Sequence, residues 1–388
     1  MNLILFDQPK VHQQLRPVTL TRPISGIRTG ILCLHEKWER RFAVTASFLT
    51  EEYLSDKFPV KYTSDNLYVN ASLLATDILV QAILGLNSGQ VLKNNEKVLA
   101  WKSELKFAFG ELPVGLEVVE FVGQVKLIAQ LPDLFLNNAE EIESDFKLLT
   151  KGRVSAEIND QHTVVYGKEN VFVEEGVNIK AAIINAETGP VYIGKNAVVQ
   201  EGSLVIGPAA ICEDSMVAFG AKIRPNTTLG PVCRVGGEVG NSIFHGYSNK
   251  AHDGFLGNSY IGEWCNLGAN TNNSNLKNDY KEVKLHSYVT NGLVSTGELF
   301  CGTFMGDYSK AGISTMFNTG TSVGVSSNVY GSGFQEKFIP SFAWGGASEG
   351  YQAYRFDKAI EVINATMARR GKQLTEIDLK ILENINKS

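Results

Sequence analysis

An apolar residue recurs at every sixth position through much of the chain, and this spacing constrains the fold more than any other feature. The first run extends from Ile193 to Val235, the second from Phe255 to Leu267 and the third from Leu293 to Val329. A period of six fits neither the 3.6-residue helical repeat nor a long strand with two-residue alternation. Short strands joined by tight turns fit it, with one inward side chain in each hexapeptide. The spacing therefore predicts a parallel β-helix in which three hexapeptides form each triangular coil. The expected inward residues are Ile193, Val199, Val205, Ile211, Val217, Ile223, Leu229, Val235, Phe255, Ile261, Leu267, Leu293, Leu299, Met305, Ala311, Phe317, Val323 and Val329.

Glycine marks the extent of this architecture. Of the 37 glycines, 28 lie between Gly167 and Gly350, and several follow an inward residue directly, as Gly194 and Gly324 do. We expect Gly and Asn at the turns to adopt the positive φ that a Cβ atom disfavours. The change in composition predicts three parts, which are residues 1–150, residues 151–345 and residues 346–388.

The composition excludes several classes of protein. The chain has 388 residues, and its 36 basic and 41 acidic residues give a net charge of −5, without the basic footprint of a nucleic-acid binder. No apolar run approaches the roughly 20 residues that span a bilayer, and the start has no basic segment typical of a signal peptide. Five scattered cysteines without a CxxC pair argue against a disulfide framework or a thiolate zinc site. A cytoplasmic location without a membrane or nucleic-acid partner is therefore expected.

The hexapeptide register breaks twice, between Val235 and Phe255 and between Leu267 and Leu293. Stacked coils alone form a smooth prism, and functional residues are often carried by loops on a rigid scaffold. We therefore expect excursions from the prism at both breaks, and we expect the functional site to be built there.

The segment before the repeat has a mixed α/β pattern. Apolar runs at Asn2–Phe6 and Ile31–Leu34 predict strands, and residues 73–84 carry a helical apolar stripe. Residues 1–150 are therefore expected to form an α/β domain.

The tail after the repeat is expected to be helical. Four apolar residues, Phe356, Ile360, Ile363 and Met367, fall on one helical face. Gly371 is suited to end this helix, and a second short helix can start near Thr375. The tail is thus expected to pack on the protein through this apolar face.

The motifs around the first break resemble a known family. The repeat resembles the left-handed hexapeptide acyltransferase superfamily. Residues 237–284 contain, in chain order, His252, Gly257, Ile261-Gly262, Asn266-Leu267-Gly268-Ala269, Asn275 and Lys281. With these positions the segment resembles the acetyltransferase half of the bifunctional glucosamine-1-phosphate acetyltransferase/N-acetylglucosamine-1-phosphate uridylyltransferase family.

This resemblance implies a left-handed β-helix, a homotrimer, acetyl-CoA as co-substrate and an amino-sugar phosphate as acceptor. It also implies that His252 is the general base, that Asn275 helps to hold the catalytic machinery, and that Asn266 and Lys281 grip the sugar phosphate. Arg224 is a further candidate for that phosphate. Ala269, Gly306 and Lys310 are the candidates for contacting acetyl-CoA. Phe255 and Leu276 stand where the family has tyrosines, and this difference bears on the identity of the acceptor sugar.

These residue types suit acetyl transfer to an amine. Histidine has an ordinary pKa near neutrality, so it can take the amine proton as nitrogen attacks the thioester. Lysine and arginine can bind a phosphate through charge-assisted hydrogen bonds. The oxyanion that forms needs a nearby N–H donor, and the glycines around Gly268 would allow close backbone approach.

A second resemblance concerns the N-terminal domain. Residues 15–23, LRPVTLTRP, resemble the start of the sugar-phosphate nucleotidylyltransferases, whose glycine-rich loop cradles nucleotide phosphates. The preceding stretch here contains no glycine, and three residues replace the family's functional groups: Gln14 the arginine, Ile24 the lysine and Asn70 the magnesium-binding aspartate. We therefore expect weak or absent nucleotidyl transfer, with Mg²⁺ a cofactor only if this domain is active. Arg16 and Arg22 remain candidates for a nucleotide or sugar phosphate.

Three functions remain open at this point. The first is acetyl transfer to an amino-sugar phosphate, and the second is nucleotidyl transfer of the UDP-N-acetylglucosamine pyrophosphorylase type. The third is a non-catalytic trimer that binds sugar nucleotides. A metal site like that of the γ-type carbonic anhydrases would use His245, His252 and His286, but no acidic pattern accompanies them, so no metal is expected.

Overall fold

The computed structural model describes residues 1–387, which form two compact units. The first unit contains residues 1–27, 32–133 and 375–387, and the second contains residues 28–31 and 134–374. The first is an α/β domain and the second is a parallel β-helix with two associated helices. No helix within residues 1–387 combines the length and the hydropathy of a membrane span.

The first unit is built on a six-stranded sheet with the order β2-β1-β3-β5-β4-β6. Strands β2, β1 and β3 are parallel, and β5 is antiparallel to β3 and β4. Its aromatic core includes Tyr68 and Trp101, which stack with ring centroids 4.7 Å apart. The strands are β1 (Asn2–Phe6), β2 (Ala46–Leu49), β3 (Asn66–Asn70), β4 (Gln90–Asn94), β5 (Lys97–Ser103) and β6 (Glu117–Glu120). The helices are α1 (Pro9–Gln14), η1 (Val18–Leu20), η2 (Ile24–Gly26), α2 (Leu34–Phe42), α3 (Glu52–Ser55), α4 (Asp77–Leu84) and α8 (Glu376–Lys387); α5 (Pro132–Leu136) begins at the end of this unit.

Local hydrogen bonds decide where the expected elements begin. The strand Asn2–Phe6 is confirmed as β1, but the strand expected at Ile31–Leu34 is wrong because α2 starts at Leu34. The Glu36 carboxylate accepts the Cys33 N–H at 2.6 Å and caps this helix. The helix expected over residues 73–84 begins only at Asp77, where the Thr76 hydroxyl accepts a backbone N–H.

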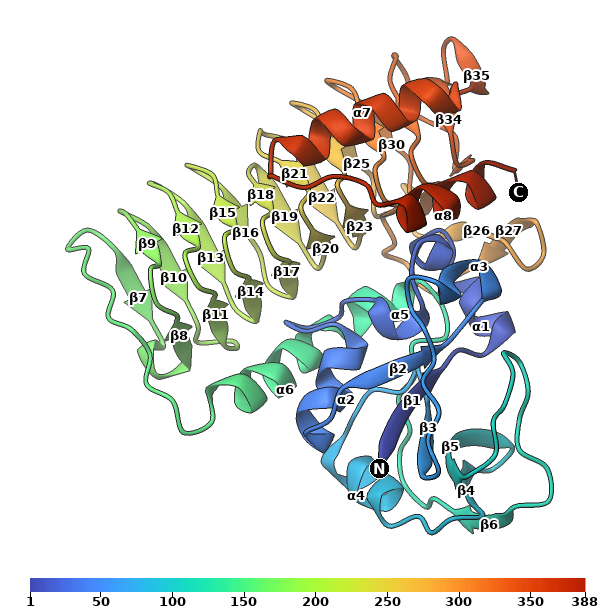
Figure 1. Cartoon of the computed structure of the whole chain (residues 1–388). Helices are drawn as coiled ribbons and strands as arrows, with labels where there is room; N and C mark the ends of the chain where they lie inside the picture. Colours follow the sequence, from blue (N-terminus) through green and yellow to red (C-terminus); the bar gives the residue numbers. More distant parts are fainter. Residues whose placement is uncertain (388) are drawn as a thin grey trace. The chain divides into compact units, whose positions relative to one another are not determined.

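The second unit stacks its short strands into three faces, seen as successive turns in Figure 1. The first face contains β7 (Val164–Tyr166), β10 (Ile183–Asn185), β13 (Leu204–Ile206), β16 (Lys222–Ile223), β19 (Glu238–Gly240) and β22 (Phe255–Gly257), followed by the pair β25 (Asn272–Asn273) and β30 (Met316–Phe317). The second face contains β8 (Val171–Val173), β11 (Val191–Ile193), β14 (Ala209–Ile211), β17 (Thr227–Leu229), β20 (Ile243–Gly246), β23 (Tyr260–Glu263), β28 (Thr303–Met305), β31 (Thr321–Val323) and β33 (Phe338–Ile339). The third face contains β9 (Asn178–Ile179), β12 (Val198–Val199), β15 (Met216–Val217), β18 (Arg234–Val235), β21 (Asn249–Lys250), β24 (Asn266–Leu267), β29 (Lys310–Ala311), β32 (Asn328–Val329), β34 (Ala343–Gly346) and β35 (Gly350–Ala353). A short helix, η3 (Lys168–Asn170), links β7 to β8.

The hexapeptide interpretation is confirmed for the first run of inward residues. Strand pairing advances from Val191 to Ala209 and then to Thr227, which is one coil at each step. The side chains from Ile193 to Val235 that were expected to point inward are all fully buried in one continuous core. This column of apolar side chains is the main hydrophobic core of the second unit.

Glycine has two distinct roles in the turns. Asn196 and Asn226 adopt positive φ at turns as expected, and so do Gly202 and Gly220. The glycines that follow inward residues do not, so their expected role is wrong. Instead they allow close stacking, because a Cβ on Gly194 would lie 2.6 Å from the Glu213 nitrogen and one on Gly324 would lie 2.2 Å from the Ser341 nitrogen.

The two register breaks differ in nature. The first is not an excursion, because Thr228 pairs with Ile243 and Asn249 with Asn266, so the coils continue with slightly fewer residues. Because these coils are shorter, the inward position moves one residue along the chain, from Phe255 to Leu256. Leu256 therefore lies in the core, and Phe255 is only half-buried. The expectation that Phe255 points inward is therefore wrong.

The second break is an excursion that carries an antiparallel hairpin of β26 (Lys284–Ser287) and β27 (Gly292–Ser295). Pairing of the coils resumes between Ile261 and Met305. Leu293 and Leu299 are 51% and 45% exposed and lie outside the core, so their expected inward positions are wrong.

Two helices pack on the β-helix within the second unit. Helix α6 (Asn138–Thr150) lies on the second face, where Ile142 joins a cluster with Phe172 and Tyr192. Helix α7 (Phe356–Ala368) runs along the turns beside the third face (Figure 1). Its predicted apolar face is confirmed by the burial of Ile363 and Met367, and the predicted stop occurs at Gly371, which has a φ of +64°.

The second tail helix is also confirmed and is longer than expected. Helix α8 begins after Thr375, whose hydroxyl accepts the Asp378 N–H at 3.1 Å while the Asp378 carboxylate accepts the Thr375 N–H at 3.0 Å. This reciprocal pair fixes the helix start. Within the first unit, Asp378 also forms an ion pair with Lys57 at 2.7 Å, which ties α8 to the end of α3.

The shifted register predicts unequal effects of two neighbouring substitutions. Leu256→Ala should lower the free energy of unfolding by about 2–5 kcal/mol because it leaves a cavity in the apolar column. Phe255→Ala should cost clearly less, because the Phe255 ring is only half-buried. Urea denaturation followed by circular dichroism measures both, and a larger loss from Phe255→Ala would contradict the observed register.

Candidate active site

His252 lies on an exposed turn between β21 and β22, where the chain passes from the third face to the first. Its imidazole makes no hydrogen bond within residues 1–387, whereas its backbone carbonyl accepts one from the Lys250 ammonium at 3.0 Å. The backbone of this turn is therefore fixed, and the ring remains available to a ligand.

Lys250 occupies an inward position where other coils carry an apolar residue, because it pairs with Val235 of the preceding coil. Its ammonium donates to the carbonyls of Gly236, at 3.3 Å, and His252. Burial lowers the pKa of Lys250 to about 8, and nearby Asp253 opposes this decrease. A cation inside the prism thus anchors the turn that carries His252.

Two asparagines of the next coil hold the other end of the same segment. The Asn272 side chain accepts the Phe255 N–H at 2.7 Å, and the Asn273 side chain accepts the Gly257 N–H at 2.9 Å. Beside them, the Asn275 amide donates to the Asn258 side chain at 2.8 Å. Asn275 is therefore placed next to β22, on the first face.

The two candidate phosphate-binding cations lie on the surface and face carboxylates. Arg224 is 3.1 Å from Glu238, and Lys281 is 3.4 Å from Asp279. Exposed ion pairs of this kind contribute little to stability and can exchange partners. An anionic ligand would have to displace these carboxylates.

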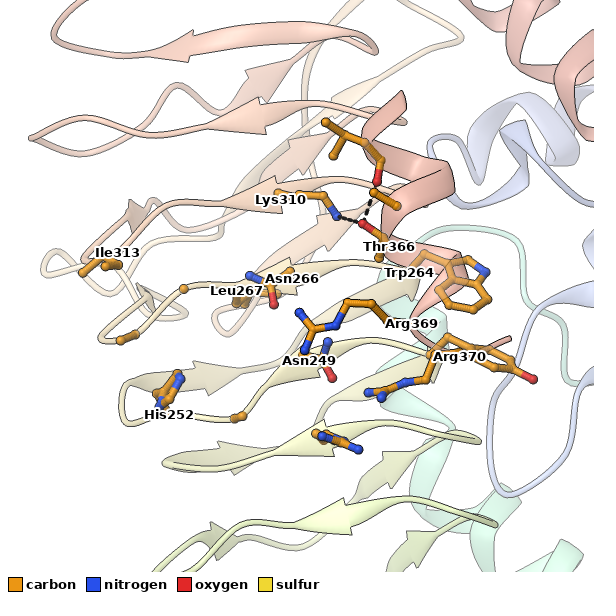
Figure 2. A pocket seen from close by; sticks show the side chains of 17 residues that line it. Asn249, His252, Trp264, Asn266, Leu267, Lys310, Ile313, Thr366, Arg369 and Arg370 are labelled. Carbon is orange, nitrogen blue, oxygen red and sulfur yellow. Dashed lines mark hydrogen bonds between the residues drawn. The ribbon is translucent and has the colours of Figure 1, made fainter. Parts of the chain in front are cut away.

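A cavity of about 690 Å³ lies between the third face and α7, and Figure 2 shows its lining side chains. Six of the residues singled out from the sequence line it: His252, Asn266, Leu267, Gly268, Ala269 and Lys310. The Lys310 ammonium donates to the Thr366 hydroxyl of α7 at 3.2 Å, and burial lowers the pKa of Lys310. Gly306 does not line this cavity; a Cβ there would meet the backbone of Gly324.

The sequence interpretation missed several residues of this cavity. The most prominent are Arg234, Arg369 and Arg370, accompanied by Asn249 and Trp264. Arg369 and Arg370 directly follow the predicted amphipathic helix, and this pair could have indicated a basic site at its end. Only the fold shows that the end of this helix lies over the third face.

The candidate residues of the N-terminal domain are engaged in structural contacts. Arg16 forms an ion pair with Glu51 at 3.2 Å, and the Arg22 side chain is buried. Gln14 is the last residue of α1, and the Ile24 N–H donates to the Asp7 carboxylate at 3.1 Å. The stretch that stands in for a glycine-rich phosphate loop is thus a short helix followed by buried turns.

Asp7 lies at the carboxyl end of β1, where an open α/β sheet usually binds its ligand. Burial raises its pKa to about 6, and nearby His12 opposes that shift. Its carboxylate accepts hydrogen bonds from Thr50, at 2.7 Å, and from Ile24. Asp7, Thr50 and Ile24 thus form a buried hydrogen-bonded cluster at this end of the sheet.

The residues present do not fit a magnesium ion at the position that the nucleotidylyltransferase resemblance indicates. The Asn70 side-chain oxygen already accepts the Ser72 N–H at 3.0 Å and the Ser72 hydroxyl at 2.8 Å. Mg²⁺ prefers carboxylate oxygens, and the adjacent Asp7 carboxylate is occupied as described. The Asn70 side chain therefore stabilises the turn after β3 through these two hydrogen bonds.

The histidines considered for a metal site have separate surroundings. The His245 ring lies 2.7 Å from the Tyr260 hydroxyl, and His286 stacks on Phe338 with centroids 3.7 Å apart. Within residues 1–387, no group of three histidine, cysteine, aspartate or glutamate side chains is arranged to hold a metal ion.

Comparison with known proteins gives matches to one family model, to curated relatives and to solved structures. Residues 3–154 match the family model described as sugar nucleotidyl transferase. A bifunctional sugar-1-phosphate nucleotidylyltransferase/acetyltransferase of Sulfurisphaera tokodaii is 31% identical over 160 residues, which cover 41% of this chain and 37% of that protein. A bifunctional protein GlmU of Methanocaldococcus jannaschii is 40% identical over 106 residues, covering 27% of this chain and 25% of the relative. The matched part of the chain thus spans only 25–37% of the length of these curated relatives.

Among solved structures, the polySia-specific acetyltransferase NeuO matches with a TM-score of 0.25 and 12% identity, covering 50% of this chain and 83% of that chain. An Arabidopsis UDP-N-acetylglucosamine acyltransferase matches with a TM-score of 0.23 and 11% identity, covering 54% of this chain and 76% of that chain.

The fold and the family match together define a class, in which a nucleotidyltransferase domain is followed by a parallel β-helix of hexapeptides. The sequence matches show that parts of this chain are similar to a sugar nucleotidyl transferase domain and to bifunctional nucleotidylyltransferase/acetyltransferases.

The buried position of Lys250 predicts a specific pH dependence of stability. Its pKa in the folded protein, about 8, lies below its ordinary 10.5, so the unfolded chain binds more protons between these values. The free energy of unfolding contributed by this group therefore rises as pH increases through that window. Lys250→Met should remove about 1–3 kcal/mol of this rise, since one pKa unit corresponds to about 1.36 kcal/mol.

Urea denaturation at pH 7.5 and at pH 10 measures the difference. Lys222→Met is the matched control, because Lys222 is exposed on a neighbouring coil. Equal pH slopes for wild type and Lys250→Met would contradict the role given to burial.

Proposed function

We propose that the protein is an acetyl-CoA-dependent N-acetyltransferase acting on an amino-sugar phosphate of the glucosamine-1-phosphate type. One observation carries the proposal most: an anchored turn presents an unhindered histidine at the edge of a basic cavity. The GlmU-like family supports the same reaction class. Sugar-nucleotide or cell-envelope precursor synthesis is the corresponding context.

In this proposal, His252 acts as the general base. The amine nitrogen of the acceptor attacks the thioester carbonyl as its proton passes to the imidazole. The tetrahedral intermediate then collapses, the carbon–sulfur bond breaks, and the leaving CoA sulfur receives the proton. The products are an N-acetyl sugar phosphate and free CoA.

The remaining candidates bind and orient the two substrates. Asn275 positions the segment around β22, and Asn266 contacts the acceptor from β24. Arg224 and Lys281 bind its phosphate after exchanging their present carboxylate partners. Ala269 and Lys310 contact acetyl-CoA in the cavity, whereas the position of Gly306 gives it at most an indirect role through coil stacking.

A homotrimer and a cytoplasmic location belong to the same proposal. The first face carries exposed Val164 and Ile183 in register and is not the face covered by α6 or α7, so it offers an apolar surface to another copy. The odd number of scattered cysteines suits a reducing compartment.

The first test is His252→Ala, assayed by release of free thiol from acetyl-CoA with glucosamine 1-phosphate. Loss of a general base should lower the rate by about 10²–10⁴-fold. The melting temperature should change little, because the side chain is exposed. His162→Ala is the matched control, since His162 is also exposed but lies far along the chain from the cavity. A His252→Ala protein that keeps more than half of wild-type turnover would refute the assignment.

We further propose that the N-terminal domain has little or no uridylyl-transfer activity, although its family match favours that reaction as the second candidate. Gln14, Ile24 and Asn70 replace the groups on which the reaction depends, and Asn70 is committed to Ser72. The full-length protein should release no measurable pyrophosphate from UTP and N-acetylglucosamine 1-phosphate with Mg²⁺. Rapid magnesium-dependent release would show instead that this domain is an active nucleotidylyltransferase.

A further inference from the structure

Lys250 interrupts the apolar column on the third face of the β-helix. Strand pairing aligns it with Val217 and Val235 of the two preceding coils, and the pairing of Asn249 with Asn266 places it beside Leu267 in the next coil. Its side chain is only 1% exposed. Lysine is rarely buried unless its ammonium group has partners, so packing alone does not explain a lysine at this position.

The ammonium of Lys250 lies between two successive turns that lead from the third face to the first. It donates to the Gly236 carbonyl of the preceding coil at 3.3 Å and to the His252 carbonyl of its own coil at 3.0 Å. A Cβ on Gly237 would lie 2.9 Å from the Lys250 nitrogen, so the preceding turn also packs closely on the ammonium. Lys250 thus joins the turn that carries the candidate base to its neighbour.

One carboxylate influences this ammonium. Burial lowers the pKa of Lys250 to about 8, and Asp253 of the same turn opposes the decrease. Arg234 and the His252 ring are exposed and line the outer cavity, and Glu238 pairs with Arg224 on the surface. The core residues of the adjoining coils are apolar, namely Val235, Val239, Leu256 and Leu267.

The charge on Lys250 determines how firmly the turn is held. Hydrogen bonds from an ammonium are roughly twice as strong as those from a neutral donor, and a buried charge is costly without its partners. A neutral amine loses much less when either carbonyl moves away. The imidazole of His252 makes no hydrogen bond within residues 1–387, so the backbone of this turn determines where the ring points.

We propose that Lys250 is a positioning residue for acetyl transfer, whose charged ammonium holds the His252 turn against the preceding coil. Its buried side chain acts only through the direction of the His252 ring. The effect on turnover rests on the proposed function, whereas the immobilisation of the turn does not.

Two properties should therefore change in opposite directions with pH. The contribution of Lys250 to turnover should fall as pH rises through about 8, because the ammonium loses its proton. Its contribution to the free energy of unfolding should rise over the same interval, because the unfolded chain then binds more protons. Unfolding consequently does not account for the expected loss of turnover.

The first test compares the full-length wild type with Lys250→Leu, which restores an apolar residue to the column. Transfer of labelled acetyl groups from acetyl-CoA to glucosamine 1-phosphate is followed from pH 7 to pH 10. At pH 7 the variant should turn over about 10-fold more slowly, with kcat affected more than either KM, since two charge-assisted hydrogen bonds are lost. The ratio of wild-type to variant turnover should approach unity by pH 10, and this ratio cancels the titration of the substrates.

Two further variants complete this test. Lys180→Leu is the matched control, because Lys180 is exposed beside β9 on the same face, and it should match wild type at every pH. Lys250→Arg keeps its positive charge throughout this range, so its turnover relative to wild type should rise above pH 8. This second variant also provides the test if circular dichroism shows that Lys250→Leu does not fold.

Hydrogen exchange provides a measurement that needs no activity. At pH 7 the backbone amides of residues 251–257 should exchange about 10-fold faster in Lys250→Leu than in wild type or Lys180→Leu. Turnover ratios that do not vary with pH, or equal exchange in all three proteins, would overturn the proposal. Faster exchange in a protein whose wild type transfers no acetyl groups would refute the proposed function and still confirm that Lys250 immobilises the turn.

Discussion

The stacking of one short coil on the next is the constraint on which the second unit depends. Each coil contributes only a few inward side chains, so none is stable alone, and the core exists only because neighbouring coils align in register. Close backbone contact between coils is part of this alignment, as the space around Gly194 shows. Elements attached to this column, such as α7, are thereby held at fixed positions along it.

The candidate site arises where the apolar column is interrupted. Lys250 and Asn273 occupy inward positions, and their polar groups satisfy backbone carbonyl and amide groups of the segment between them. A buried polar group costs free energy unless it is hydrogen-bonded, so these contacts fix the turn bearing His252. The backbone of the turn is thus held in place by the β-helix, while the ring of the exposed His252 makes no hydrogen bond within residues 1–387.

The sequence predicted the β-helix well because its signal repeats many times, and single departures leave the period visible. It failed for Phe255 and Leu293, because a coil that is one to three residues shorter, or a hairpin inserted between coils, shifts the register without changing the local composition. The helix at residues 356–368 was predicted from its own pattern. Its placement over the third face was not, since packing between distant segments leaves no local signature, and the basic cavity was missed with it. In the N-terminal domain, the absence of glycine before Leu15 correctly indicated a structure other than an open phosphate loop.

A structure of the protein crystallised with CoA would test the central claim most directly, which is that the anchored histidine and the basic cavity form one site. The account predicts that CoA lies in this cavity against Ala269 and Lys310 and that its thiol end lies beside His252. CoA bound elsewhere on the β-helix, with the cavity beneath α7 free of ligand, would contradict the account.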